Sequence, residues 1–99
     1  GAGALSISAV LTSGTVLTDA NQVVRVDPSG GGFTLTLPAA ASFSGEVVVV
    51  KNVTSSANLV VVAAGGSDTV DGASQATLSG AMFHWQAVSD GVSQWMVTA

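Results

Sequence analysis

Residues 45–52 read Gly-Glu-Val-Val-Val-Val-Lys-Asn, GEVVVVKN, and this stretch decides the fold. Four consecutive valines favour a β-strand, because β-branched side chains suit an extended backbone. Successive side chains of a strand point to opposite faces, so this strand carries apolar groups on both of them. A strand with one face in water would alternate apolar with polar residues. Something other than water must therefore cover the second face of Val47–Val50.

The composition also indicates a covered surface. The chain has 99 residues, which suits one small domain or a piece of a longer rod. Only 8% of its residues are charged, against roughly 25% in an ordinary soluble domain, and 47% are hydrophobic. Such a chain has few polar groups for its exterior, and large exposed apolar patches usually mark interfaces. We therefore expect copies of the chain to cover one another.

Charge excludes two classes of partner. The net charge is −4, and Arg25 and Lys51 are the only basic residues. Nucleic acids and anionic membranes are bound by clustered Lys and Arg, so neither partner is expected. No apolar run is long enough to span a bilayer. The chain has no cysteine, which excludes disulfides and thiolate chemistry.

Short strand-like runs recur between turn signals along the whole chain. Strands spaced every 8 to 12 residues predict an all-β fold, here a small antiparallel sandwich or barrel-like module. The small-residue connection Ala39–Ser44 has room for one helical turn. The expected strands are Leu5–Leu11, Gln22–Val26, Phe33–Leu37, Glu46–Val53, Leu59–Ala63, Thr69–Val70, Ala76–Leu78, Met82–Val88 and Gln94–Thr98.

The order of several short motifs in residues 33–97 resembles a small β module of tailed-bacteriophage virion proteins. In that family an alternating strand ends in Leu-Pro, and a later strand closes with Lys-Asn. A Gly-Ser-Asp-Thr-Ile-Asp-Gly turn and a terminal Ser-Asp-Gly-x-x-x-Trp follow. The matching residues here are Leu37-Pro38, Gly45, Lys51-Asn52, Gly66–Gly72, Ser89-Asp90-Gly91 and Trp95. One departure is His84-Trp85-Gln86, where the family more often has a plain alternating strand.

The resemblance implies a homotrimeric structural protein of the virion, in the capsid surface or in a tail or head fibre. It implies no catalytic residue and no cofactor, so an enzyme is not expected. The implied partners are further copies of the chain and the major capsid protein or another virion protein. Residues 33–99 form the expected module. Residues 1–32 have no counterpart and are expected to form an N-terminal arm with the first strands, and to attach the protein to a neighbour.

Trimerisation would cover the second face of the valine strand. The residues predicted to form the oligomer interface are Val47, Val48, Val49, Val50, Val60 and Val62. The alternative is a strand that lies centrally in one sandwich and is covered by its own chain, since buried central strands also read as continuous apolar runs.

The segment Gly65–Gly72 is a weak candidate for a metal site. Asp68 and Asp71 supply two carboxylates, whereas a hard cation such as Ca²⁺ takes six to eight oxygen ligands. We therefore expect no metal; the two aspartates should cap turns, with Asp71-Gly72 as a hairpin turn.

His84, Trp85 and Trp95 are the candidate contacts for a glycan or a protein partner. An aromatic ring can stack on a sugar while His84 binds its hydroxyls. The alternative is that both tryptophans anchor the core. In Met82–Val88, alternation places Phe83, Trp85 and Ala87 on one face and His84 and Gln86 on the other. No nucleophile or further metal ligand accompanies His84, so a catalytic triad is not indicated.

Three roles follow from these observations. The favoured one is a capsid decoration (cement) protein that stabilises the phage head. The second is a module of a tail or head fibre that binds a host receptor, such as a glycan. The third is an adhesin or carbohydrate-binding module outside phage. The sequon Asn52-Val53-Thr54 is interpreted as a strand end.

Overall fold

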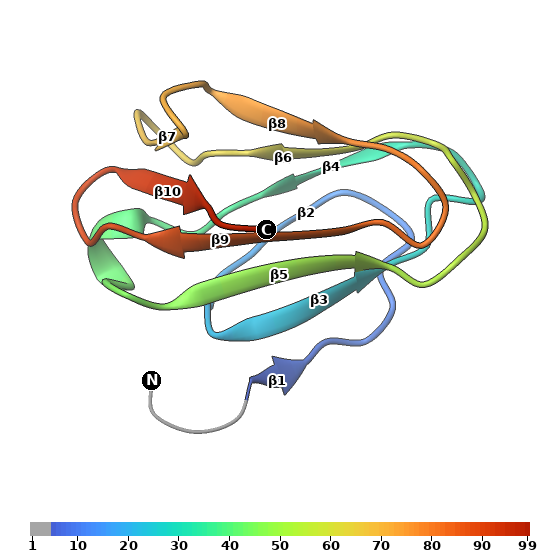
Figure 1. Ribbon diagram of the computed structural model, residues 1–99, viewed down its shortest axis with the longest axis horizontal. Coiled ribbons are helices and arrows are strands. Elements are labelled where there is room, and N and C mark those ends of the chain that lie inside the picture. Colours follow the sequence, from blue (N-terminus) through green and yellow to red (C-terminus); the bar gives the residue numbers. More distant parts are fainter. Residues whose placement is uncertain (1–4) are drawn as a thin grey trace.

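The computed structural model describes residues 5–99 as two β-sheets packed face to face (Figure 1). Within this range there are ten strands and one 3₁₀ helix, η1 (Ala40–Ser42). Sheet A has the order β1 (Ser6–Ile7), β3 (Gln22–Val26), β5 (Val47–Asn52), β9 (His84–Ser89), β10 (Gln94–Val97) and β7 (Thr69–Val70). Sheet B has the order β2 (Thr15–Val16), β4 (Phe33–Thr36), β6 (Val60–Ala63) and β8 (Gln75–Leu78).

The chain changes sheet after each of its first eight strands. It enters sheet A at β1, crosses to sheet B at β2 and returns to sheet A at β3, and this continues as far as β9. Up to β6 each return brings the chain back in the same direction, so β1, β3 and β5 are parallel, as are β2, β4 and β6. The first six strands therefore form three successive coils of a flattened winding. Strand β9 then pairs antiparallel with β5 and with β10.

The predicted antiparallel sandwich is thus correct in its two all-β layers and wrong in its strand directions. Five of the eight strand pairings are parallel and three are antiparallel. The physical reason lies in the first six strands: a short hairpin makes neighbouring strands antiparallel, whereas here the chain crosses to the other sheet and back before it reaches each parallel neighbour.

The core lies between the sheets and contains the inward-facing residue of each alternating pair. Val48 and Val50 of β5, with Val24 and Val26 of β3, are completely buried from the side of sheet A. The opposing layer comes from Leu35, Val60 and Val62 of sheet B, which are also completely buried. Trp95 is the largest fully buried side chain, and its indole Nε1–H donates to the carbonyl oxygen of Pro38 at 3.1 Å.

Residues 5–32 belong to the same two sheets as the rest of the described chain. Strand β3 lies between β1 and β5, and its Val24 and Val26 pack in the common core. The predicted division at residue 32 therefore does not correspond to a change of structural unit. Residues 1–4 of the predicted attachment segment lie outside the described residues.

Candidate functional site

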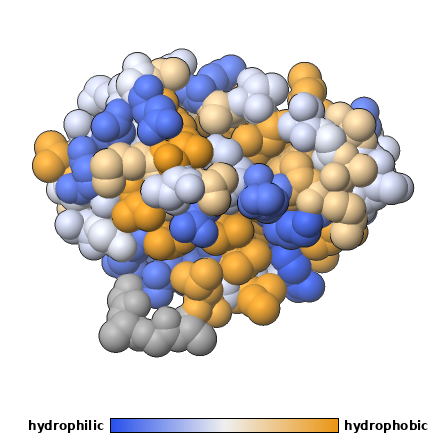
Figure 2. Space-filling model, viewed as in Figure 1, coloured by the Kyte–Doolittle hydropathy of each residue, from blue (hydrophilic) through white to orange (hydrophobic). Residues whose placement is uncertain are grey.

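The outer face of sheet A carries apolar side chains on four neighbouring strands, β3, β5, β9 and β10. Side chains that alternate with the buried ones point outward, and these include Val23, Val47, Val49, Val88 and Met96, which we call the valine face. The register places Val23 beside Val49, Val47 beside Val88, and Val88 beside Met96. The valines are half-buried by one another, and Met96 is 38% exposed. Figure 2 shows apolar side chains over β1, β3 and β5, interleaved with polar ones.

The structure divides the six valines of the predicted interface into two sets. Val48, Val50, Val60 and Val62 are completely buried inside the protomer, so they are not available to a neighbouring chain. For these four, the interface prediction is corrected to the intramolecular alternative. Val47 and Val49 lie on the valine face, and for them the interface role stays a prediction.

One end of the valine face carries the two basic residues of the protein, Arg25 and Lys51, and its one histidine. Arg25, Lys51 and His84 occupy adjacent positions on β3, β5 and β9, since Arg25 pairs with Lys51 and Lys51 with His84. We call these three residues the basic row. The Arg25 guanidinium donates to the carbonyl oxygen of Ser8 from Nε at 2.8 Å and from Nη2 at 2.6 Å. Lys51 Nζ donates to the carbonyl oxygen of Met82.

The opposite end of the sandwich is built around η1. The Ala40 amide donates to Asp68 Oδ2 at 2.9 Å, and the Ala40 carbonyl accepts a hydrogen bond from Ser89 Oγ at 2.6 Å. The Gly45 amide donates to the carbonyl oxygen of Ser89 at 3.0 Å. A side chain at Gly91 would collide with Ser44, 2.7 Å from its Cβ, and Gly91 has a φ of +81°. Several motif residues of the phage resemblance therefore meet here as packing and turn residues, whereas Lys51 and Asn52 lie at the opposite end.

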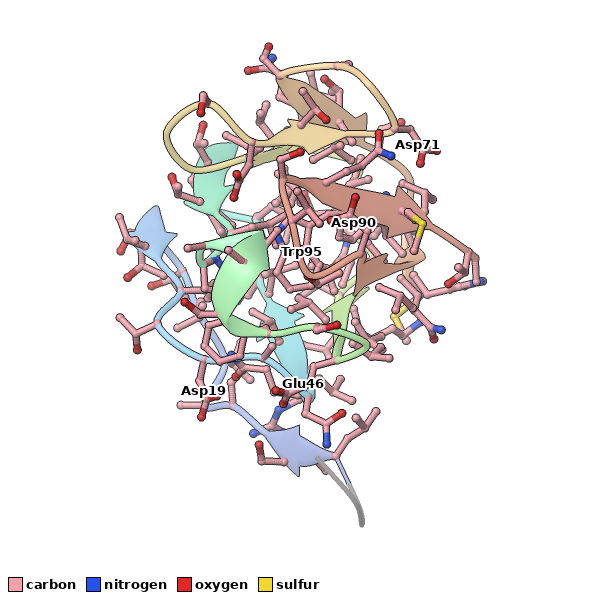
Figure 3. All side chains as sticks on the ribbon, turned by 90° about the vertical axis from the view of Figure 1, so that its left-hand side faces the viewer. Asp19, Glu46, Asp71, Asp90 and Trp95 are labelled. Carbon is pink, nitrogen blue, oxygen red and sulfur yellow. The ribbon has the colours of Figure 1, made fainter. Side chains whose placement is uncertain are left out.

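The η1 end of the sandwich is also its acidic end, which we define as Asp19, Glu46, Asp68, Asp71 and Asp90. Figure 3 looks onto this end and shows Asp19, Glu46, Asp71 and Asp90 around the more central Trp95. Asp90 Oδ1 accepts hydrogen bonds from the backbone amides of Val92, Ser93 and Gln94 at 2.8, 3.0 and 3.1 Å. The bonds from Val92 and Gln94 in particular hold the pKa of Asp90 below its usual value.

Asp71 and Gly72 form the expected hairpin-type turn. Their φ angles are +47° and +82°, and Val70 and Ala73 exchange backbone hydrogen bonds of 2.7 and 2.9 Å across the turn. Two positive φ values are typical of a type I′ turn. Asp71 Oδ1 accepts from the Val97 amide at 3.0 Å, and Asp68 caps η1, so both carboxylates bind backbone groups. Among residues 5–99, no three His, Asp or Glu side chains come together as metal ligands.

The two tryptophans predicted as glycan contacts are buried. Trp95 is completely inaccessible and Trp85 is 5% exposed, so neither ring can stack on a sugar; both anchor the core, as the alternative held. The predicted faces of β9 are correct, because Trp85 and Ala87 point inward while His84 is exposed. His84 alone of the three is available to a partner, and it stays a predicted contact.

Asn52 is a buried structural residue. Its amide nitrogen donates to the carbonyl oxygens of Ser56 and Gly80 at 2.9 and 3.2 Å. Its Oδ1 accepts from the amide and the hydroxyl of Thr54 at 2.9 and 2.8 Å. All four hydrogen-bonding positions of the amide are filled. The sequon is therefore a strand end that holds two loops together, as expected.

The first coil presents a second apolar surface. Strands β1 and β2 are the edges of their sheets, and Ile7 and Val16 on them are 67% and 65% exposed. Leu5 and Val10 in the same coil are also exposed. No charged residue occurs from Leu5 to Thr18, whereas edge strands commonly carry charge that prevents pairing with other chains. This coil lies within the segment predicted to attach the protein to a neighbour.

The described part of the surface has no pocket. None of residues 5–99 forms a helix that is long and apolar enough to cross a membrane.

Sequence reasoning missed Val23, Val88 and Arg25 as parts of one surface. The signal was present in the alternation. Val23 and Arg25 alternate with the buried Val24 and Val26, and Val88 shares a face with His84. The order of the strands could not be predicted from the sequence, and it is this order that places β3 and β9 on either side of β5.

Comparison with known proteins gives no relative: no protein-family model matches the chain, and no curated protein matches it.

Proposed function

We propose that this protein is a structural protein of a tailed-phage virion, a homotrimer that decorates the capsid and stabilises the head. The observation that carries the proposal is the valine face. Its five apolar side chains lie on the outside of sheet A, where the four valines are half-buried and Met96 is exposed. A contiguous exposed apolar patch is typical of a surface that another protein covers.

Two further features support this role. Pro38, Asp68, Ser89 and Trp95 of the phage-like motifs have structural contacts around η1, which suits a module recognised by its fold and not by a reactive site. The exposed, uncharged first coil offers a separate surface for the capsid. Self-association through sheet A and attachment through the first coil can therefore occur together.

Two measurements test the proposal. Sedimentation velocity should give a trimer at micromolar concentration, and a stable monomer at 100 µM would overturn self-association. Co-sedimentation with expanded phage heads should show binding and a raised temperature of head disruption. A variant lacking residues 1–10 should stay trimeric and lose head binding. A trimer that binds no heads would instead support the fibre alternative.

A further inference from the structure

The charges of sheet A are arranged with one polarity. Strand β3 has Asp19 before it and Arg25 near its far end, and β5 likewise runs from Glu46 to Lys51. Strand β9 runs in the opposite direction, so its first residue, His84, lies beside Lys51, and Asp90 follows the strand at the end where Glu46 lies. The three central strands thus share one acidic end, and the other end carries the basic row, with Asp27 after β3. About 13 Å separate Val47 from Lys51 along β5, at about 3.3 Å per residue.

The basic row is unfavourable in an isolated copy. Arg25 and Lys51 are directly opposite each other on parallel strands, and like charges in such positions repel. Within the described chain both groups donate to backbone carbonyls and not to carboxylates. The nearby Asp27 accepts from the amide and hydroxyl of Ser29 at 3.0 and 2.5 Å, and these bonds lower its pKa. A carboxylate from outside the protomer would relieve the repulsion in the row.

We propose that a second copy of this chain supplies those carboxylates: the basic row of one copy binds the acidic end of the next, and the valine face is buried beside this contact. The inference rests on the self-association proposed above and specifies its orientation. Copies with a net charge of −4 repel one another in most orientations. Contacts between two basic rows or two acidic ends bring like charges together. A contact between unlike ends is attractive, and its heterologous geometry can close into a ring such as a trimer.

The test uses sedimentation velocity on the full chain in 50 mM and 500 mM NaCl. Lys51→Glu and Asp19→Lys should each weaken association about tenfold or more at low salt. A 1:1 mixture of the two variants should recover association in part, because each supplies the end that the other has lost, while a closed trimer of the two keeps one mismatched contact. The wild-type assembly should weaken at high salt, where charges are screened beyond about 4 Å.

The control variants change the net charge by the same amounts as Lys51→Glu and Asp19→Lys, but at positions far from the basic row and the acidic end. Thr34→Glu with Thr77→Glu adds two negative charges on the exposed face of sheet B, and the corresponding Lys pair adds two positive ones. Both pairs should associate like the wild type. Fluorescence of the buried Trp85 and Trp95 confirms folding of each variant. If wild type associates but Lys51→Glu does so equally well, or the mixture recovers nothing, the inference is wrong while the proposed function stands. If wild type does not associate at all, the proposed function is wrong as well.

Discussion

The two sheets of this protein have similar inner faces and different outer faces. Inside, both present valine and leucine, among them Val50 on β5 and Leu35 on β4. Outside, sheet A presents the valine face, whereas sheet B presents mainly threonine and glutamine, with the exposed Thr34, Gln75 and Thr77. Sheet B thus has the polar exterior of an ordinary half-exposed sheet, and sheet A does not.

The difference shows that burial in the protomer explains only half of the apolar residues in β5. Val48 and Val50 pack in the core between the sheets, while Val47 and Val49 point away from it. An outer face that stays apolar beside a polar counterpart is the observation on which the proposed self-association rests. The following predictions test this division, from the largest expected effect to the smallest.

Truncation of inner-face residues should cost the most stability, on either sheet. Leu35→Ala should lower the free energy of unfolding by about 2–5 kcal/mol, because it removes buried methyl groups and leaves a cavity. Val50→Ala should lower it by about 2 kcal/mol. Its neighbour Val49→Ala should cost less than about 1 kcal/mol. Urea denaturation under conditions that favour the monomer measures all three. Equal costs for Val49 and Val50 would contradict the division of β5 into a core face and a contact face.

A carboxylate introduced on the outer face of sheet A should weaken association, whereas one introduced on the outer face of sheet B should not. Val49→Asp should raise the dissociation constant of the assembly about tenfold or more, since it places a carboxylate in the middle of the valine face. Thr34→Asp, at an exposed position of sheet B, should leave the constant unchanged. Sedimentation equilibrium gives both values. An assembly that tolerates Val49→Asp does not use this face.

Two substitutions can make the polar outer face of sheet B apolar, like the outer face of sheet A. Thr34 and Thr77 lie on either side of Val61 across β4, β6 and β8. Thr34→Val with Thr77→Val therefore completes a row of three valines, and species larger than the wild-type assembly should appear in light scattering. Stability should change by only about 0.5 kcal/mol, because the sites are on the surface. The single variant Thr34→Val is the control, with a smaller effect.

The smallest effect concerns the β9–β10 turn, which belongs to sheet A alone. The pKa of Asp90 is lower in the folded protein than its ordinary value of 3.8, so the folded state binds this proton less readily than the unfolded chain does. The stability from this group is complete above pH 3.8 and is lost as the pH falls through the folded-state pKa. Unfolding measured between pH 2 and 6 should show this decline. Asp90→Asn should make the decline shallower, with the remainder due in part to Asp27, whose pKa is also lowered. If Asp90→Asn leaves the pH dependence of stability unchanged, Asp90 does not contribute to the decline.

Much of the local structure could be predicted from the sequence. Alternation and turn residues gave the bounds of β3 and β7 and the approximate position of most other strands, and they gave the buried face of β9. They did not give β2, because Thr15-Val16 is too short to form an alternating pattern. The turns at Asp71 and Asp90 were predictable for the same local reason: side chain and backbone of neighbouring residues determine them.

Strand partners could not be predicted in this way. A period of two assigns a side chain to a face, but it contains no information on which strand lies beside it. Val49 could be recognised as outward-facing once Val50 was taken as core. That Val23 and Gln86 would be its neighbours depends on strands 26 and 37 residues away along the chain. The valine face and the basic row are therefore properties of the pairing, and only the structure reveals them.

The alternation between sheets has a consequence for how the protein folds. Parallel partners such as Val24 and Val50 are separated by an entire visit to the other sheet, so a long loop must close before their contact is gained. Among the pairs of strands formed by residues 5–99, β9 and β10 alone are joined by a short turn, which brings Ser89 beside Trp95. Folding should begin at this C-terminal hairpin and be slow for a chain of this size, because non-local pairing dominates. During synthesis on the ribosome this hairpin emerges after the coils that precede it, so those coils cannot complete their folding until the hairpin has formed.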